Sequence, residues 1–247
     1  MQLDRIIAVR NNKTVFCDED RCYKVFSRDY SKADVFGEAF NHSLAEETGL
    51  NVPKLLEVLK IDGKWTLISE YIEGKPLSRL IKERPKKTDE YLNLFVDLQL
   101  EIQKKSSPLF KSLKSKMSRS IASSGLSKTV ILSLLARLEE IPEGTNLCHG
   151  DFSPENVIIA ENGNPYTIDW PHAASGNASF DAAKTLLLFR LNGENESAEK
   201  YLELFCKKSN IQKQCIENAI PLVAASEISK SNEKERNFFK ICIDIAD

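Results

Sequence analysis

The chain has 247 residues, of which 42% are hydrophobic and 28% are charged, and its formal net charge is −2 at pH 7. A chain of this length and composition can bury a core as one large domain or as two lobes. The balanced charge gives no general attraction to nucleic acid, and no apolar run approaches the roughly 20 residues that a membrane helix needs. Residues 1–12 lack the pattern of a signal peptide, so we expect a cytoplasmic protein that binds neither nucleic acid nor membrane.

The chain begins with three short apolar stretches, at residues 6–9, 14–17 and 22–26, which predict a small antiparallel meander. Two further strands are predicted within residues 54–72, where the dipeptide Asp62-Gly63 is a strong hairpin signal. The N-terminal part of the chain is therefore expected to form a sheet.

One helix is predicted between these two groups of strands. Ser31, followed three residues later by Asp34, is typical of a helix N-terminus, and Gly49 stands where the helix would end. Apolar residues recur between them at helical spacing. His42 lies in this helix, and we expect it to be partly exposed.

Beyond residue 77 the pattern becomes helical as far as residue 140, with Thr88 and Ser127 as expected N-caps. Apolar residues at helical spacing, Leu132 among them, mark faces that we expect to be buried. After a short interruption by strands, the pattern is helical again from Ser179 onward.

The change from strands to helices near Gly74 predicts two lobes. Residues 1–73 would form a small lobe of sheet plus one helix, and residues 74–247 a larger, mainly helical lobe. This is an α+β organisation.

The strands that interrupt the helical pattern lie within residues 147–170. This segment carries the densest group of polar side chains in the chain, and its sequence is LCHGDFSPENVIIAENGNPYTIDW. An Asn-Gly dipeptide between two short strand candidates predicts a hairpin. Its two outer ends carry Asn156 and Asp169, whose side-chain oxygens should lie close together, with Asp151 on the loop just before.

Such oxygen atoms have a chemical use. Asn156 and Asp169 would suit Mg²⁺, which takes the rest of its shell from water and substrate phosphates. Asp151 would then be the carboxylate that orients an acceptor hydroxyl in phosphoryl transfer. The alternative interpretation is that these are only turn residues, since turns favour Asp, Asn and Gly.

The stretch resembles the catalytic and metal loops of the kinase-like small-molecule phosphotransferases, a family that includes aminoglycoside phosphotransferases and choline kinases. The match rests on HGD at residues 149–151, on Asn156 and on IDW at residues 168–170. A looser match, in the same order, covers roughly residues 10–185. The resemblance implies a two-lobed protein-kinase-like fold, and an ATP- and Mg²⁺-dependent transfer of the γ-phosphate to a hydroxyl of a small molecule.

By this resemblance Asp151 is the catalytic base, Asn156 and Asp169 hold Mg²⁺, and His149 supports the loop. Asp181 is retained downstream and is expected to anchor the loops, whereas Asn177 and Ala178 stand where relatives commonly have Asp-Pro.

The resemblance also assigns the nucleotide site to the N-terminal lobe. Lys24 would hold the α- and β-phosphates, paired with Glu38 on the following helix. Glu46 and Glu47 are the alternative partners, in a less favourable position near the end of the helix.

Residues Glu70, Tyr71 and Ile72 would form the hinge between the lobes, and their backbone would bond adenine. An ordinary strand that ends in a turn is the alternative interpretation of this segment.

The chain departs from protein kinases in several respects. Residues 10–17, where a phosphate-covering loop should be, contain no glycine, and there is no D-F-G or A-P-E motif. A protein acceptor is therefore disfavoured, although an atypical protein kinase stays an alternative. A catalytically weak nucleotide-binding regulatory module is the other alternative, against which the retention of all four residues Lys24, Asp151, Asn156 and Asp169 argues.

The sequence does not identify the acceptor, but its distribution of acidic and basic residues bears on the charge of the acceptor. Residues 102–138 contain no acid and eight basic residues, whereas the chain from Asn192 onward has ten acids and eight bases. A polycationic aminoglycoside needs a concentration of acids. We therefore expect a neutral or mildly charged hydroxyl compound. The oligomeric state, monomer or dimer, stays open.

Overall fold

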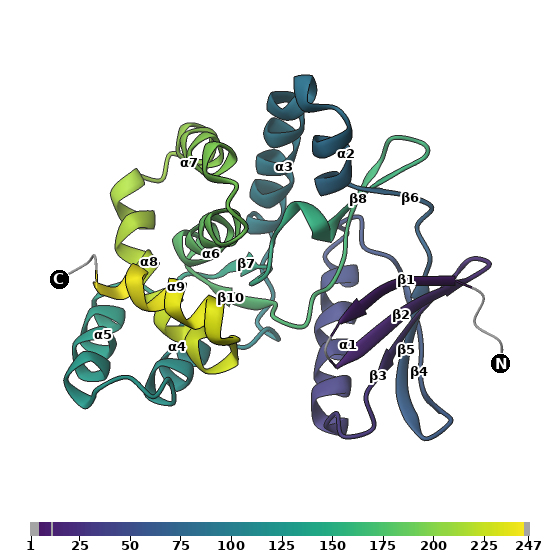
Figure 1. The fold of residues 1–247 in the computed structure, drawn as a ribbon, viewed down its shortest axis with the longest axis horizontal. Helices are drawn as coiled ribbons and strands as arrows, with labels where there is room; N and C mark the ends of the chain where they lie inside the picture. The colour runs from purple at the N-terminus through teal and green to yellow at the C-terminus, as the bar shows by residue number, and fades with distance from the viewer. Residues whose placement is uncertain (1–4, 11, 245–247) are drawn as a thin grey trace. The chain divides into compact units, whose positions relative to one another are not determined.

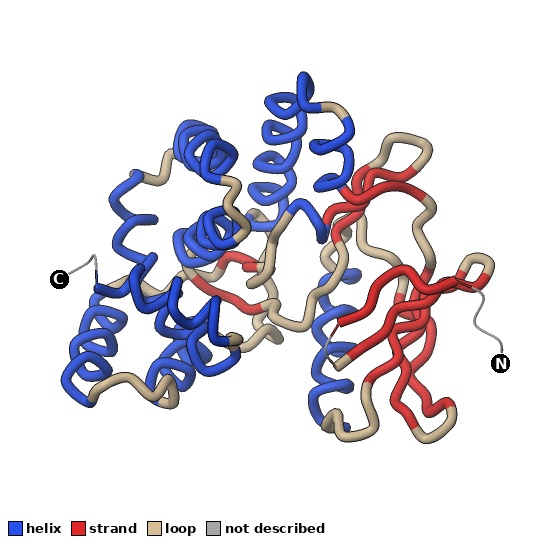
Figure 2. The backbone as a smooth tube through the Cα atoms, viewed as in Figure 1, coloured by secondary structure: helices blue, strands red, loops and turns tan. Residues whose placement is uncertain are grey.

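The computed structural model describes residues 5–10 and 12–244. The chain forms two compact units: unit 1 consists of Met1–Glu83 and Pro154–His172, and unit 2 of Arg84–Ser153 and Ala173–Asp247. Strands (red in Figure 2) gather in unit 1, whereas unit 2 is mainly helical. Over the described ranges, no helix combines the length and the apolar character needed to cross a membrane.

Unit 1 is built on a five-stranded antiparallel sheet with the strand order β1-β2-β3-β5-β4. Its strands are β1 (Arg5–Arg10), β2 (Lys13–Asp18), β3 (Arg21–Phe26), β4 (Leu55–Ile61) and β5 (Lys64–Glu70). The predicted meander and hairpin are both present. Asp62 and Gly63 have φ values of 48° and 75°, as the tight turn between β4 and β5 requires.

The predicted helix, α1 (Lys32–Glu47), lies along one face of this sheet (Figure 1). Ser31 caps it, because the Ser31 hydroxyl accepts a hydrogen bond from the Ala33 N–H at 3.2 Å. Val35 and Ala39 on α1 pack against Phe26 and Leu67 of the sheet, which together form the core of unit 1.

A second, three-stranded sheet in unit 1 has the order β6-β8-β9. It consists of β6 (Gly74–Pro76), β8 (Val157–Ala160) and β9 (Pro165–Thr167), with α2 (Leu77–Glu83) after β6 and the short helix η2 (Pro154–Asn156) before β8. Strands β8 and β9 form the predicted hairpin, whose turn contains Gly163 at φ 85°.

The pairing of β6 with β8 explains why the two units do not divide at Gly74. A Cβ atom on Gly74 would lie 2.3 Å from the Ile159 carbonyl oxygen, so only glycine lets the two strands approach this closely. The β8–β9 hairpin is thereby held in unit 1, although it was expected in the larger lobe. The predicted boundary near Gly74 separates a nucleotide-binding lobe from a catalytic lobe. It differs from the boundaries of the two compact units, and it stays a prediction.

Unit 2 contains longer helices around two short paired strands. The helices are η1 (Pro85–Lys87), α3 (Thr88–Gln103), α4 (Leu113–Ala122), α5 (Lys128–Glu140), α6 (Ala178–Leu191), α7 (Asn195–Ser209), α8 (Lys213–Glu227), η3 (Ile228–Lys230) and α9 (Glu233–Asp244); the strands are β7 (Asn146–Cys148) and β10 (Ala174–Gly176). Residues 178–187 of α6 are all buried, so α6 is the central helix of this unit.

Two details of the helical part differ from expectation. Thr88 is the first residue of α3 rather than its N-cap, and its hydroxyl donates to the Pro85 carbonyl at 2.8 Å. Leu132 is 58% exposed, because the apolar run in α5 extends around more than one face. The unit buries Leu138, which the same spacing predicted to be buried, together with Leu134. Ser127 does cap α5, as predicted.

Candidate active site

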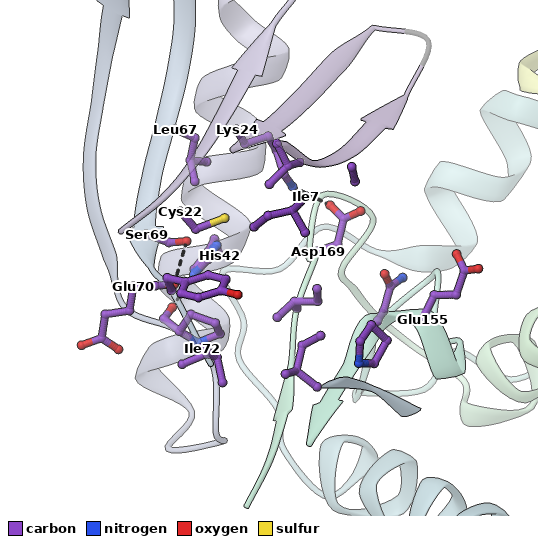
Figure 3. A pocket seen from close by; sticks show the side chains of 18 of the residues that line it. Ile7, Cys22, Lys24, His42, Leu67, Ser69, Glu70, Ile72, Glu155 and Asp169 are labelled. Carbon is purple, nitrogen blue, oxygen red and sulfur yellow. Dashed lines mark hydrogen bonds and ion pairs between the residues drawn. The ribbon is translucent and has the colours of Figure 1, made fainter. Parts of the chain in front are cut away.

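Unit 1 contains a pocket of about 320 Å³, a volume suited to a small ligand (Figure 3). Apolar side chains from both sheets form its walls: Ile7, Val15, Leu67, Ile158 and Ile168. Lys24 and Asp169 lie at one end of the pocket, and the segment after β5 lies at the other. The pocket thus combines an apolar slot with a charged end.

Lys24 is the centre of the charged end. Its Nζ lies 2.5 Å from Glu38 Oε1 and 2.7 Å from Asp169 Oδ1, and its side chain is 16% exposed. Burial alone would lower the pKa of the Lys24 ammonium, but the charges of Asp169 and Glu38 and the hydrogen bonds to both raise it above its ordinary value. Lys24 is therefore a fixed cation that joins β3, α1 and the β8–β9 hairpin.

The local sequence explains why Lys24 meets Glu38. Side chains alternate along a strand, so Lys24 points to the same face as Phe26, the face that α1 covers. On α1, Glu38 follows Val35 by three residues and shares its buried face. The rival Glu46 instead accepts a hydrogen bond from the Leu55 N–H at 3.0 Å.

Asn156 and Asp169 stand at the two ends of the hairpin, and both line the pocket. The Ile168 N–H donates to the Asn156 carbonyl at 3.0 Å, which keeps the two ends side by side. Asp169 has a φ of 66°, a left-handed conformation that costs energy in a residue other than glycine and that occurs often at functional sites. Next to it, the buried Trp170 donates from Nε1 to the Thr167 carbonyl at 3.0 Å and fixes the strand end.

Asn156 and Asp169 suit Mg²⁺, the ion that the family resemblance implies. An amide oxygen and a carboxylate are hard oxygen ligands of the kind that Mg²⁺ takes together with water and phosphate oxygens. Within residues 5–10 and 12–244 no group of three or more His, Cys, Asp or Glu side chains could hold a metal ion by itself. A Mg²⁺ at Asn156 and Asp169 would complete its shell with water and phosphate oxygens.

Lys13 is a pocket residue that the sequence analysis missed. It opens β2, and its Nζ lies 3.4 Å from Asp169 Oδ1, the oxygen that also contacts Lys24. The predicted strand pairing could have indicated Lys13. Val15 pairs with Lys24, and cross-strand partners point to the same face. Lys13, two residues before Val15, shares that face. Asn11, two residues before Lys13, lies outside the described residues.

The predicted hinge residues Glu70, Tyr71 and Ile72 all line the pocket. The Glu70 N–H donates to the Lys54 carbonyl at 2.9 Å, and the Tyr71 N–H donates to the Asp20 carbonyl at 2.7 Å. The Ile72 N–H is thus the one hinge donor for which no acceptor is found in the described part of the chain. The side chain of Glu70 points away from the pocket (Figure 3).

The expectation that His42 is partly exposed is wrong. His42 is 8% exposed, lines the pocket, and has its Nε2 2.6 Å from the Pro53 carbonyl oxygen. Burial lowers the pKa of His42, although the hydrogen bond to Pro53 acts in the opposite direction. The reason for its burial is that the segment before β4 covers this side of α1.

The predicted catalytic loop lies in unit 2 and follows β7. His149 is fully buried, and its Nδ1 accepts a hydrogen bond from the Asp151 N–H at 3.3 Å. Gly150 has a φ of 78°, and its N–H donates to Asp181 Oδ1 at 2.8 Å. The loop is therefore held by His149 on one side and by the buried carboxylate of Asp181 on the other. Both hydrogen bonds go to backbone N–H groups of the loop, and neither involves the Asp151 side chain.

Asp181 is itself held in place. It is 2% exposed, and its Oδ2 accepts hydrogen bonds from Gln99 and Gln103 of α3 at 3.1 and 3.3 Å. Asn177, which replaces the acid common in relatives, still caps α6 by accepting from the Ser179 N–H at 2.9 Å. In this way unit 2 brings together His149, Asp151 and Asp181, while unit 1 brings together the remaining predicted site residues.

Two comparisons with known proteins, one with family models and one with solved structures, find similar chains. Residues 6–213 match the model of the phosphotransferase enzyme family. A thermostable mutant of the aminoglycoside phosphotransferase APH(4)-Ia is 15% identical with a TM-score of 0.71, over 97% of this chain and 92% of that one. The choline kinase LicA from Streptococcus pneumoniae is 19% identical with a TM-score of 0.65, over 99% and 92% of the two chains.

A search of curated proteins finds no significant match. The likeness to the two solved structures confirms the predicted kinase-like fold. Because the family model covers most of the sequence, the chain belongs to the phosphotransferase enzyme family.

Proposed function

We propose that this protein transfers the γ-phosphate of ATP to a hydroxyl group of a small molecule, with Mg²⁺ as the metal. The observation that carries the proposal is the buried Lys24, bonded to both Glu38 and Asp169 at the charged end of an apolar pocket. A nucleotide requires this combination, an apolar slot for the base and fixed cations for the phosphates.

The nucleotide would be oriented by the hinge and the lysines. Adenine fits between the apolar walls, where the Ile72 N–H offers a donor at the hinge. The Glu70 carbonyl, which accepts from the Ser69 hydroxyl at 3.4 Å, offers its second lone pair as an acceptor. Tyr71 contributes a wall rather than a donor, because its N–H already binds Asp20. Lys24 and Lys13 would then contact the phosphates.

Asp151 would be the general base. As the acceptor oxygen forms its bond to the γ-phosphorus, Asp151 takes the hydroxyl proton, and the bond from phosphorus to the β,γ-bridging oxygen breaks so that ADP leaves with the electron pair. Mg²⁺ at Asn156 and Asp169 would supply charge neutralisation on the phosphates.

A screen for ADP release tests the function directly. Sugars, amino alcohols, nucleosides and aminoglycosides would be offered with Mg-ATP. Release that depends on one acceptor class supports the phosphotransferase. Tight Mg-ATP binding without release in any class would instead favour the nucleotide-binding regulatory module.

Replacing Asp169 with Asn should remove most of the Mg²⁺ dependence of ATP binding. Asn tolerates the left-handed φ of this position, so the change removes the charge without adding backbone strain. Calorimetric titration of ATP with and without Mg²⁺ measures the effect. If the variant required Mg²⁺ as strongly as the wild type does, the metal site would have to lie elsewhere.

Replacing Lys13 with Met should weaken ATP binding roughly tenfold, or about 1.4 kcal/mol, because a partly buried cation facing the phosphates is lost. The matched control is Lys64→Met, a change of an exposed lysine in the β4–β5 hairpin of the same sheet. Equal affinities of both variants would remove Lys13 from the phosphate site.

For the acceptor we propose a neutral or mildly charged hydroxyl compound rather than an aminoglycoside. The acid-free stretch of residues 102–138 is part of unit 2 and includes α4 and α5 as far as Leu138. Kanamycin-type substrates should therefore be turned over poorly in steady-state assays. A kcat/KM for them of about 10⁴ M⁻¹s⁻¹ or more would contradict this point and leave the kinase assignment intact.

A further inference from the structure

Unit 2 contains a cavity of about 570 Å³ among helices α5, α6 and α8. Ligand sites commonly lie between helices and combine apolar walls with a few polar groups that fix the orientation of the ligand. The proposed phosphotransferase function does not use this cavity. Its apolar walls include Ile141, Phe180 and Leu222, and its polar groups include Arg137, Glu140 and Ser179.

The first turn of α6 gives the cavity a positive side. The Asn177 side chain, which caps α6, donates to the Pro142 carbonyl at 3.3 Å and so joins the start of this helix to the segment after α5. Asn177, Ser179 and Phe180 all line the cavity. The N-terminus of a helix carries partial positive charge, so this side of the cavity favours an anionic group.

The Ser179 hydroxyl on this side is buried and has no partner. Ser179 is 7% exposed, and its N–H donates to the Asn177 side chain at 2.9 Å. For its hydroxyl, no hydrogen bond is found with any residue within 5–10 and 12–244. A buried hydroxyl that lacks a hydrogen bond is unfavourable. A ligand that accepts a hydrogen bond from Ser179 inside the cavity would remove this cost.

Arg137 and Glu140 of α5 bring opposite charges to the same cavity. They are three residues apart, so they are neighbours on the surface of the helix. Arg137 is partly buried, whereas Glu140 is exposed. They form no ion pair with each other or with another described residue, although the adjacent Glu139 pairs with Lys114. The cavity therefore offers one cation and one anion that are both available to a ligand.

The cavity is distinct from the place where Asp151 acts. Ser179 and Asp181 are two residues apart in α6, so their side chains point to nearly opposite sides of the helix. The Asp181 carboxylate holds the Gly150 N–H of the predicted catalytic loop, whereas Ser179 lines the cavity. His149, Gly150 and Asp151 are not among the residues that line it.

We propose that this cavity binds an α-amino acid with an apolar side chain, at a site distinct from that of the phosphoryl acceptor. The carboxylate of the amino acid accepts hydrogen bonds from Arg137 and from the Ser179 hydroxyl, beside the positive end of α6. Its ammonium group pairs with Glu140, and its side chain packs against Phe180 and Leu222. This inference goes beyond the proposed function and does not depend on it.

Three probes with the same aromatic ring test the class of ligand by calorimetry without ATP. L-phenylalanine has both charged groups, 3-phenylpropanoate lacks the ammonium group, and 2-phenylethylamine lacks the carboxylate. L-phenylalanine should bind with a Kd roughly tenfold or more below those of the other two, because each of them leaves one charge of the cavity unpaired. L-leucine serves as a second apolar amino acid. Binding of neither amino acid, or equal binding of either analogue, would overturn the proposal.

Variants then place the binding in the cavity. Arg137→Gln and Ser179→Ala should each raise the Kd for L-phenylalanine, the former by roughly tenfold or more because a charged donor is lost. Glu140→Gln should raise it as well, but should not weaken the binding of 3-phenylpropanoate.

The matched control is Lys128→Gln, which removes an exposed cation at the other end of α5. Lys13→Met, in the nucleotide pocket, is the second control. Both should bind L-phenylalanine like the wild type. An unchanged Kd in Arg137→Gln and Ser179→Ala, or an equal loss in either control, would overturn the assignment to this cavity. Because no outcome involves ADP release, failure here is distinguishable from failure of the proposed function.

Discussion

Asp151→Asn should lower turnover by roughly 10²–10⁴, the usual contribution of a positioned general base. The variant keeps the shape of the side chain and loses its charge and basicity. Its loop should stay in place, because the Gly150 N–H still donates to Asp181 and the Asp151 N–H still donates to His149. Binding of Mg-ATP should be nearly unchanged.

The measurement is kcat on the true acceptor, together with calorimetric ATP binding. Glu161→Gln is the matched control, since it neutralises an exposed carboxylate in the turn of the β8–β9 hairpin. The control should turn over like the wild type. Wild-type turnover of Asp151→Asn itself would remove Asp151 from the role of base.

Features that depend on neighbouring residues could be predicted from the sequence. The Asn-Gly turn determines that Asn156 and Asp169 end on the same side of a hairpin, whatever the rest of the chain does. The pairing of Lys24 with Glu38 also has a local basis, because strand alternation and helical spacing direct both toward one interface.

Features that depend on distant segments could not be predicted from the sequence. The burial of His42 requires that the Pro53 segment folds back over α1. The Tyr71 N–H is used by Asp20, a bond that exists because the turn between β2 and β3 reaches the hinge. Likewise, the hydrogen bonds of Asp181 come from Gln99 and Gln103, about eighty residues earlier in the chain. No periodicity in the sequence encodes these partners, because they follow from packing.

The second large effect is expected from the buried ion pair of Lys24 and Glu38. Glu38 is 4% exposed, and its Oε2 finds no hydrogen-bond partner among the described residues. Lys24→Met would leave this carboxylate without its cation. Removing one partner of a buried pair typically costs about 3–5 kcal/mol of folding stability, so we expect a loss of that size in urea unfolding.

The double variant Lys24→Met/Glu38→Leu should recover most of that loss, because apolar residues of similar volume can replace a buried ion pair at little cost. Asp169 would keep Lys13 as its neighbour and stays 24% exposed, so its charge is less costly to leave. ATP binding and turnover should nevertheless stay impaired in the double variant, since the cation that we propose to contact the phosphates is absent. That combination separates the structural from the catalytic role of Lys24. A double variant as unstable as Lys24→Met alone would show that the lost stability does not come from the uncompensated Glu38 carboxylate.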